Sequence, residues 1–254
     1  MVTEEKSISF SEQRELYIQE IYPIAPKLRR KIISDNEVIK DSFERLEQLG
    51  IFLLRFPGEI GISGFHIKKS GIDCIYINSS VSLGRQYFSC WHEYYHAVTG
   101  EGSGASLFRE QSKDIIECKA NLFAGYVLMP ENLVERYIEE HNIDIKNLIF
   151  EDIINMQQYF NVSYKAVIKR LKIIYGFINN ESTLYSLSTK EEPRKLTNYI
   201  KGMGYSTRLS NATNDIYIPQ SFFNNINENF KNKRINEGKK KSIEDFLKLI
   251  KYEL

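Results

Sequence analysis

The stretch His92-Glu93-Tyr94-Tyr95-His96 places two histidines four residues apart, and the residues around it predict a helix over about 85–99. On a helix, residues four apart project from the same face, so His92 and His96 can bind one metal ion together. Glu93 lies about 100° further round the helix, beside that ion but not aimed at it. A carboxylate there can act as the general base for water on the metal. Taken alone, the pentapeptide also fits two ordinary core or surface histidines.

A second predicted helix, over about 114–128, supplies a further candidate ligand. At helical spacing, one of its faces carries Glu117, Ala120, Asn121, Ala124 and Leu128. Glu117 is the candidate third ligand, and the two alanines would let this helix pack closely against the histidine helix. Asn121 can hydrogen-bond the second ring nitrogen of a ligand histidine and fix its orientation. Two histidines, one carboxylate and one water make a tetrahedral catalytic zinc site, so we expect one Zn2+ per chain.

Other ligand sets fit this sequence less well. A third histidine in the longer H-E-x-x-H-x-x-G-x-x-H pattern would need glycine at Thr99 and histidine at Gly102, so that pattern is excluded. Glu101, Glu110 and Asp114 are rival third ligands. Glu101 follows the histidine helix too closely to leave it and return, and the other two lie in a polar stretch that reads as loop or helix start. We therefore prefer Glu117.

Length, charge and cysteine content exclude several classes of protein. The chain has 254 residues and a formal net charge of +1, which suits one core with a small appendage and does not indicate nucleic acid as a partner. No apolar run reaches the length of a membrane-spanning helix, and the polar residues 1–6 are unlike a secretion signal. Cys74, Cys90 and Cys118 are odd in number and lack metal-binding spacing. We expect reduced thiols and a cytoplasmic location.

The residues before the histidine helix predict a small sheet. Ser34-Asp35-Asn36 can cap a helix that Gly50 would end. A strand is predicted over 51–56, and a hairpin over 64–67 and 74–77. Three short strands ahead of the two candidate metal helices predict an α+β fold. In proteins that cut extended chains, the substrate often adds to the edge of such a sheet.

A helix pair follows, over 152–160 and 163–174, with Ser163 as the cap of its second helix. One interpretation is a helix-turn-helix that reads DNA. The other, which we prefer, is two helices that pack on the core. Basic residues of the second helix would then form its outer face: Lys165, Lys169, Arg170 and Lys172.

The remainder, residues 180–254, is expected to be a helical extension with some strand character. It carries two basic clusters, 231–234 and 239–241. These clusters fit a solvated helix face better than a nucleic-acid surface. If they bind a partner, attraction of an acidic one is the simpler expectation.

The combined pattern resembles the ImmA/IrrE family of zinc metallopeptidases. The similarity covers about residues 35–178 and is carried by these segments: His92–His96, Glu117-x-x-Ala120-Asn121-x-Phe123-Ala124, Leu128-Met129-Pro130, Leu46–Ile51, Tyr76–Ser79, Arg85–Phe88, Phe160–Ser163 and Arg170-Leu171. The family usually has glycine at the position of Tyr95. We expect Tyr95 to flank the substrate cleft.

The predicted organisation is a zincin-like domain over 1–150, a helical pair over 151–178 packed on it, and an extension over 179–254 whose role is not assigned. The predicted activity is zinc-dependent endopeptidase, with Glu93 as general base. The resemblance implies regulatory cleavage of a helix-turn-helix repressor, that is, an anti-repressor. Tyr95 and Tyr126 are both candidates for stabilising the oxyanion, and the sequence does not choose between them.

Two other classes of function stay open at this point. The chain could be a zinc-containing module that inactivates a repressor by binding it without cutting, although an intact Glu93 is not needed for that. It could also be a DNA-binding regulator that uses residues 152–174, against which the near-neutral charge counts. A protein substrate is the expected partner, and no oligomeric state is assigned.

Overall fold

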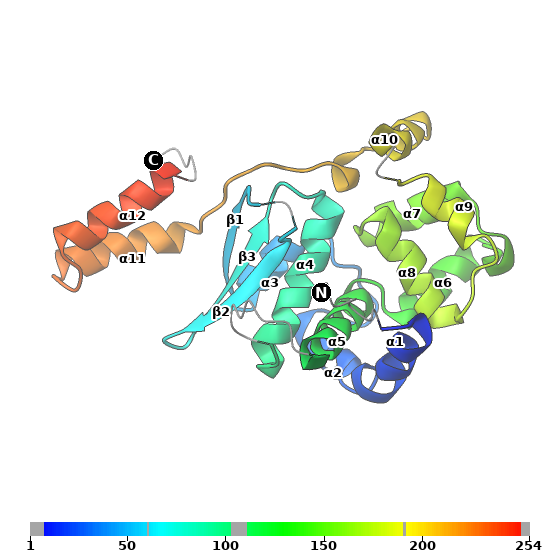
Figure 1. Ribbon diagram of the computed structural model, residues 1–254, viewed down its shortest axis with the longest axis horizontal. Coiled ribbons are helices and arrows are strands. Elements are labelled where there is room, and N and C mark those ends of the chain that lie inside the picture. The colour runs from blue at the N-terminus through cyan, green and yellow to red at the C-terminus, as the bar shows by residue number, and fades with distance from the viewer. Residues whose placement is uncertain (1–7, 60, 103–110, 190–191, 250–254) are drawn as a thin grey trace, which may run out of the picture.

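The computed structural model describes residues 8–59, 61–102, 111–189 and 192–249. A small sheet lies in the middle, with helices beside it and a helical hairpin at one end (Figure 1). The helical elements are α1 Phe10–Leu16, η1 Tyr17–Ile21, α2 Ala25–Ile32, α3 Ser42–Gln48, α4 Leu83–Thr99, α5 Gln111–Leu128, α6 Glu131–Glu140, η2 Ile145–Asn147, α7 Phe150–Phe160, α8 Tyr164–Tyr175, α9 Glu181–Ser186, α10 Pro193–Gly202, η3 Arg208–Ser210, α11 Gln220–Lys231 and α12 Glu237–Leu249.

The sheet has three strands, β1 Phe52–Phe56, β2 Gly64–Lys69 and β3 Ile72–Asn78, in the order β1-β3-β2. β1 pairs with β3 in parallel, and β2 pairs with β3 antiparallel. The hairpin turns at Ser70 and Gly71, which both have positive φ, as a two-residue hairpin loop requires. The predicted strand, hairpin and α+β class are confirmed.

The two outer edges of the sheet differ. Main-chain hydrogen bonds of 3.0 and 2.7 Å join Arg55 of β1 to Tyr217, so a late segment of the chain covers that edge. Among the described residues, no segment pairs with the outer edge of β2. β2 therefore presents an open edge to an extended peptide.

The helix before the sheet is shorter than predicted. Its cap is Asp41, whose carboxylate accepts hydrogen bonds from the Phe43 and Glu44 amides, and not the segment 34–36. The first amides of a helix can donate to any of these cap side chains, and the segment 34–36 has no hydrophobic face of its own to hold a further turn. The predicted end is confirmed, because Gly50 adopts a positive φ directly after α3.

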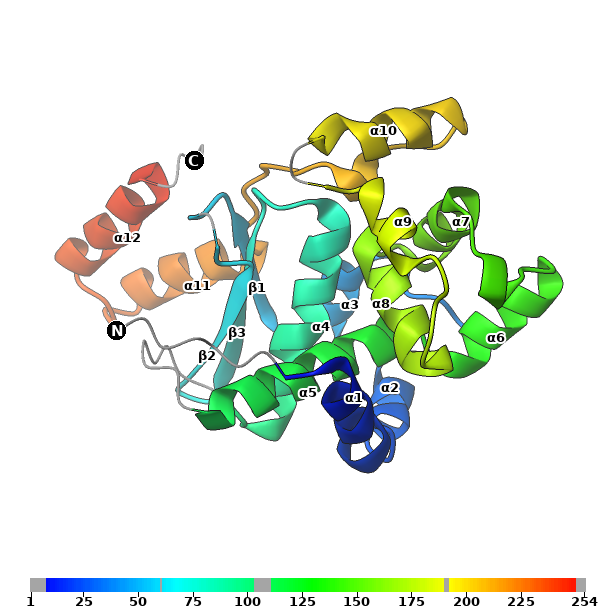
Figure 2. The ribbon, with the colours of Figure 1, turned by 45° about the vertical axis from the view of Figure 1, so that its right-hand side comes forward.

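The two helices of the candidate metal site pack against each other and beside the sheet (Figure 2). α4 contacts β2, β3 and α5. Ala120 and Ala124 of α5 are fully buried, which allows the close approach predicted for them. Pro130 then caps α6, so the second helix ends where the sequence indicated.

The α7–α8 pair packs on the body of the protein. The Ser163 hydroxyl caps α8 by accepting from the Ala166 amide, while Val167 and Leu171 are fully buried. The prediction that Arg170 lies on the outer face is wrong. Arg170 is 3% exposed and donates to the Met129 carbonyl and the Tyr17 hydroxyl, so it joins α8 to α5 and to the N-terminal segment.

The C-terminal hairpin of α11 and α12 reaches the sheet through aromatic contacts. Phe222 lies 6.0 Å from Phe52, and Phe246 lies 6.2 Å from Phe56, between ring centroids. The expected helical extension with some strand character thus corresponds to these helices and the Tyr217 bridge. Within the described part of the chain, no helix combines the length and hydrophobicity needed to span a bilayer.

Candidate metal centre

Three side chains from two helices converge on one point. His92 and His96 of α4 face each other with their Nε2 atoms 3.3 Å apart. Glu117 of α5 places one carboxylate oxygen 3.0 Å from His92 Nε2 and the other 3.6 Å from His96 Nε2. The three candidate ligand atoms all lie within 4.8 Å of one another.

These separations fit a tetrahedral metal ion. With metal–ligand distances of about 2.0–2.1 Å, two ligand atoms of a tetrahedral zinc site lie roughly 3.3 Å apart. The separation of 3.3 Å between the two Nε2 atoms matches that value. The Glu117 carboxylate offers one oxygen at 3.0 Å from His92 and its other oxygen at 3.6 Å from His96, which is close to the same spacing. Two imidazoles and one carboxylate are also the donor set of a catalytic zinc site that keeps one position open.

The second ring nitrogen of each histidine is already engaged. His92 Nδ1 lies 3.0 Å from Asn121 Oδ1, and His96 Nδ1 lies 2.7 Å from the main-chain oxygen of Glu101. Each acceptor requires the proton to be on Nδ1, which leaves the Nε2 lone pair directed at the shared point. Asn121 thus lies where the sequence placed it, one turn after Glu117.

Glu101 holds its place through further contacts. Its carboxylate accepts a 2.7 Å hydrogen bond from the Tyr95 hydroxyl and lies 3.8 Å from Lys119 Nζ. The chain turns back at this point because Gly100 and Gly102 both have positive φ. A Cβ on Gly102 would lie 3.0 Å from His96 Nδ1, so only glycine leaves room for the ring there.

Glu93 lies in the same cleft and is almost completely buried, at 8% exposure. Burial raises its pKa to about 7, with the Glu117 charge acting in the same direction and the His92 ring and the His66 amide opposing. Gly64 of β2 makes room for it, since a Cβ there would lie 3.3 Å from Glu93 Cγ. A carboxylate with a pKa near neutrality suits a general base.

The pKa values of the two candidate ligand histidines shift in opposite directions. Burial alone would lower the pKa of His92, but the hydrogen bond to Glu117 and the charges of Glu93 and Glu117 outweigh it and raise the pKa. For His96 burial prevails and the pKa is lowered, although the Glu101 carbonyl opposes this. Two carboxylates beside two imidazoles form a site whose charge a divalent cation would balance.

The rival ligands do not reach this point, or lie outside the described side chains. Glu101 contributes its main-chain oxygen to His96 and its carboxylate to Tyr95, not to the metal position. Glu110 lies outside the described residues, and the side chain of Asp114 is likewise not described. Burial keeps the pKa of Cys90 well above its ordinary value, and that of Cys118 at about 11, as expected for thiols rather than ligand thiolates.

The two tyrosines predicted for the oxyanion or the cleft lie elsewhere. Tyr95 is 2% exposed, packs on Phe123 and points its hydroxyl at Glu101. Tyr126 is on the opposite side of α5, with its ring 6.5 Å from Tyr17. Neither lines the cleft. Tyr95 is next to the ligand His96 in sequence, but the next residue on a helix points about 100° away, here towards the core.

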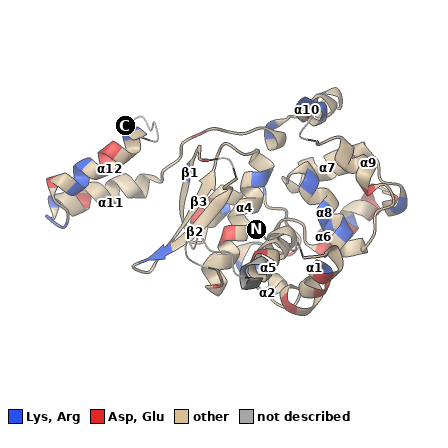
Figure 3. Cartoon of the chain, in the orientation of Figure 1, with Lys and Arg blue, Asp and Glu red and all other residues tan. Residues whose placement is uncertain are grey.

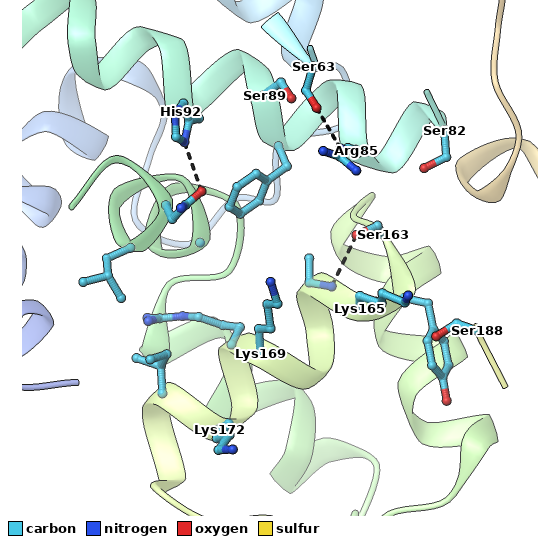
Figure 4. A pocket seen from close by; sticks show the side chains of 18 of the residues that line it. Ser63, Ser82, Arg85, Ser89, His92, Ser163, Lys165, Lys169, Lys172 and Ser188 are labelled. Carbon is cyan, nitrogen blue, oxygen red and sulfur yellow. Dashed lines mark hydrogen bonds between the residues drawn. The ribbon is translucent and has the colours of Figure 1, made fainter. Parts of the chain in front are cut away.

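A cleft of about 1000 Å3 opens beside the candidate metal site (Figure 4). Its walls come from the start of β2, from α4 and α5, and from α8. The sequence pattern gave no role in the site to Arg85, Lys165 or Lys169, which all line this cleft. The four-residue spacing of the two lysines could have indicated that they share one side of α8.

Comparisons with known proteins agree with this geometry. The model of the IrrE N-terminal-like domain (Peptidase_M78) matches residues 46–172, half of the chain. The uncharacterized protein YqaB of Bacillus subtilis is 29% identical over 150 residues, which cover 57% of this chain and 78% of YqaB. A Mycobacterium tuberculosis transcriptional regulator of known structure has a TM-score of 0.44 and 16% identity, and the match covers 64% of this chain and 52% of that one. This chain thus spans about half the length of that regulator. The family match extends over the sheet, both metal helices and most of α8, and the chain belongs to the IrrE N-terminal-like domain family of peptidases.

Proposed function

We propose that this protein is a zinc-dependent endopeptidase that cuts a helix-turn-helix repressor at one site. The observation that carries the proposal is the convergence of His92, His96 and Glu117 on one point, with Glu93 buried in the same cleft. A purely structural metal site has no use for a second carboxylate beside an open position. Family membership supports a peptidase.

His92, His96 and Glu117 would hold the ion. Zinc bound there would supply a water of lowered pKa and polarise the peptide carbonyl. Glu93 is placed to accept the proton of the attacking water and to return it to the leaving nitrogen. Asn121 and the Glu101 carbonyl keep both imidazoles in the required tautomer.

The substrate has to enter as an extended segment. The outer edge of β2 is open among the described residues, and the start of β2 lines the cleft next to Glu93. A segment that pairs with this edge would present successive carbonyls along the cleft. A folded repressor can offer such a segment only where its structure opens locally. The proposal is therefore single-site cleavage in a mobile region, in the cytoplasm, rather than general degradation.

The test is a cleavage assay on the repressor encoded beside this gene. The full-length chain, loaded with zinc, is mixed with that repressor, and intact masses are measured over time. Two fragments whose masses sum to the repressor plus one water are expected. The control is Glu93→Gln, which keeps the ligands and should produce no fragments. A stable complex of enzyme and uncut repressor, under every metal condition tried, would overturn the peptidase proposal and favour a binding module.

A further inference from the structure

Five basic residues of the described chain line the cleft beside the candidate metal site, and three of them are exposed. The exposed three are Arg85 of α4 and Lys165 and Lys169 of α8. Figure 4 shows Lys169 directed from α8 into the space between this helix and α4, which carries His92 and Arg85. Figure 3 shows basic residues on α8 and near the start of α4. Two helices that are distant in sequence thus bring positive charge to one hollow.

These charges have no carboxylate partner among the described residues. Arg85 Nε donates to the neutral Ser63 hydroxyl at 2.9 Å, and no ion pair is formed by Lys165 or Lys169 within the described part of the chain. Their neighbours on α8 differ. Lys172 lies 2.7 Å from Glu181, and Arg170 is buried against main-chain and tyrosine oxygens.

The three side chains are close enough to repel one another. Lys169 is exposed, but the walls of the cleft partly desolvate its ammonium group, which lowers its pKa first, and the positive charges of Arg85 and Lys165 lower it further. The acidic residues of the metal site do not neutralise the positive charge of these three side chains. Glu93 and Glu117 together balance the two positive charges of a divalent ion, so the wall opposite keeps its excess.

The distance from the reacting atoms sets where a substrate would meet this wall. Arg85 precedes His92 by seven residues on α4, which is about 10 Å along the helix axis. An extended chain covers about 3.3 Å per residue, so three residues span that distance. Arg85 is also fixed at the start of β2 through Ser63, where the open edge begins.

We propose that this wall selects substrates that carry acidic side chains about three residues from the cut bond. The inference rests on the proposed peptidase function and names its substrate class. Carboxylates of an extended segment would pair with Arg85, Lys165 and Lys169, and a basic segment would be repelled. Such charge complementarity contributes to selectivity and association rate more than to affinity.

The same lysines do not suit duplex DNA. A recognition helix has to expose its basic face so that it can enter a major groove. On α8, the side that bears Lys165 and Lys169 is a wall of the cleft and faces α4. Both lysines are exposed to solvent within the cleft, but a duplex could reach them along α8 only if α4 did not lie opposite.

Three quenched fluorescent decapeptides test the inference. They share an Ala-Leu centre and differ only at the third residue on each side, which is Glu, Gln or Lys. The zinc-loaded full chain should cut the Glu peptide fastest and the Lys peptide slowest, with kcat/KM differing on the order of tenfold. The Lys165→Ala/Lys169→Ala double variant should reduce this ratio to about threefold or less. Lys172→Ala is the matched control, since its charge is already paired, and should keep the full ratio.

Binding separates this inference from the peptidase proposal. Anisotropy of the same peptides, labelled, is measured with the zinc-loaded Glu93→Gln chain, which needs no turnover. If no decapeptide is cut but the Glu peptide binds best and the double variant loses that preference, the charge inference holds, and the repressor cleavage assay decides the peptidase proposal separately. If peptides are cut but Glu and Lys peptides are equal, the inference is overturned. A single-stranded 20-mer DNA that displaces the Glu peptide at a lower concentration than the unlabelled peptide does would also overturn it.

Discussion

The Tyr95 hydroxyl donates a 2.7 Å hydrogen bond to Glu101 Oε2, and through that bond it holds the carbonyl that orients His96. Tyr95 is buried on the core side of α4, and stands where the resembled family usually has glycine. Its role here is to fix the turn after α4, not to shape the cleft. Glu101 is thus not a metal ligand; it connects Tyr95 to the metal site through its carboxylate and its main-chain oxygen.

Tyr95→Phe should weaken zinc binding by roughly tenfold while leaving the fold intact, because loss of an outer-shell partner typically costs 10–100-fold in metal affinity and this one acts through Glu101. Competition with a chromophoric chelator measures the zinc Kd, and circular dichroism checks the fold.

Tyr94→Phe is the matched control for that variant. Tyr94 is the adjacent buried tyrosine, and its hydroxyl makes no hydrogen bond within the described residues. Its zinc Kd should equal that of the wild type. Equal zinc affinities for Tyr95→Phe and Tyr94→Phe would show that the link through Glu101 has no effect on the metal site.

Asn121 offers a test by loss and rescue. Asn121→Ala removes the acceptor for His92 Nδ1, so zinc affinity should fall by about 10–100-fold. Asn121→Asp keeps an oxygen in the same place and should restore most of the affinity. The measurement is the zinc Kd of each variant, compared with that of the wild type. A role in helix packing alone predicts that aspartate would not rescue.

The sequence predicted which of these side chains share a face of their own helix, because that depends on local periodicity, whereas the contact between the two faces depends on how α4 and α5 pack. Residues four apart on a helix share a face, so helical spacing alone is enough to place His92, His96 and the Glu117–Asn121 pair. The three strands and the end of α5 at Pro130 followed from equally local signals. The substrate side of the site could not be predicted in this way, since Arg85 and Lys169 meet only when α8 packs opposite α4.

The close approach of α4 to the start of α8 supplies a stability test. A Cβ on Gly84 would lie 2.6 Å from the main-chain nitrogen of Ser163. Alanine is favoured over glycine in a helix by about 1 kcal/mol, but overpacking against backbone costs about 1–3 kcal/mol. Gly84→Ala should therefore lower the free energy of unfolding in urea, despite its better helix propensity.

Gly125→Ala is the matched control on α5. Its nearest contact would be Arg170 Cδ at 3.8 Å, an ordinary van der Waals distance. This variant should be neutral or stabilising by up to about 1 kcal/mol. Equal stability changes at both positions would mean that α4 and α8 do not meet as closely as described.

Other errors of the sequence interpretation also come from long-range packing. The sequence groups Arg170 with the lysines of an outer helix face, but the Met129 carbonyl and the Tyr17 hydroxyl satisfy its guanidinium inside the protein. The early helix begins at Ser42, with Asp41 as its cap, rather than at 34–36, because the polar segment 34–36 has no hydrophobic face to hold a further turn.

Glu93→Gln should separate the base from the ligands. The amide cannot take a proton from water, so hydrolysis of the repressor or of the Glu peptide should fall on the order of a hundredfold or more. Zinc content and the urea midpoint should stay at wild-type values, because Glu93 is not one of the three converging ligands. Wild-type turnover in this variant would exclude Glu93 as the general base.

The central claim is that His92, His96 and Glu117 form one metal site, and a zinc titration of the wild type beside Glu117→Ala tests it most directly. The adjacent Cys118→Ser is the matched control. We predict one zinc per chain for the wild type and for Cys118→Ser, and an affinity at least roughly a hundredfold lower for Glu117→Ala, since a lost ligand should cost at least as much as a lost outer-shell partner. Wild-type zinc affinity in Glu117→Ala, or loss of zinc in Cys118→Ser, would contradict this assignment.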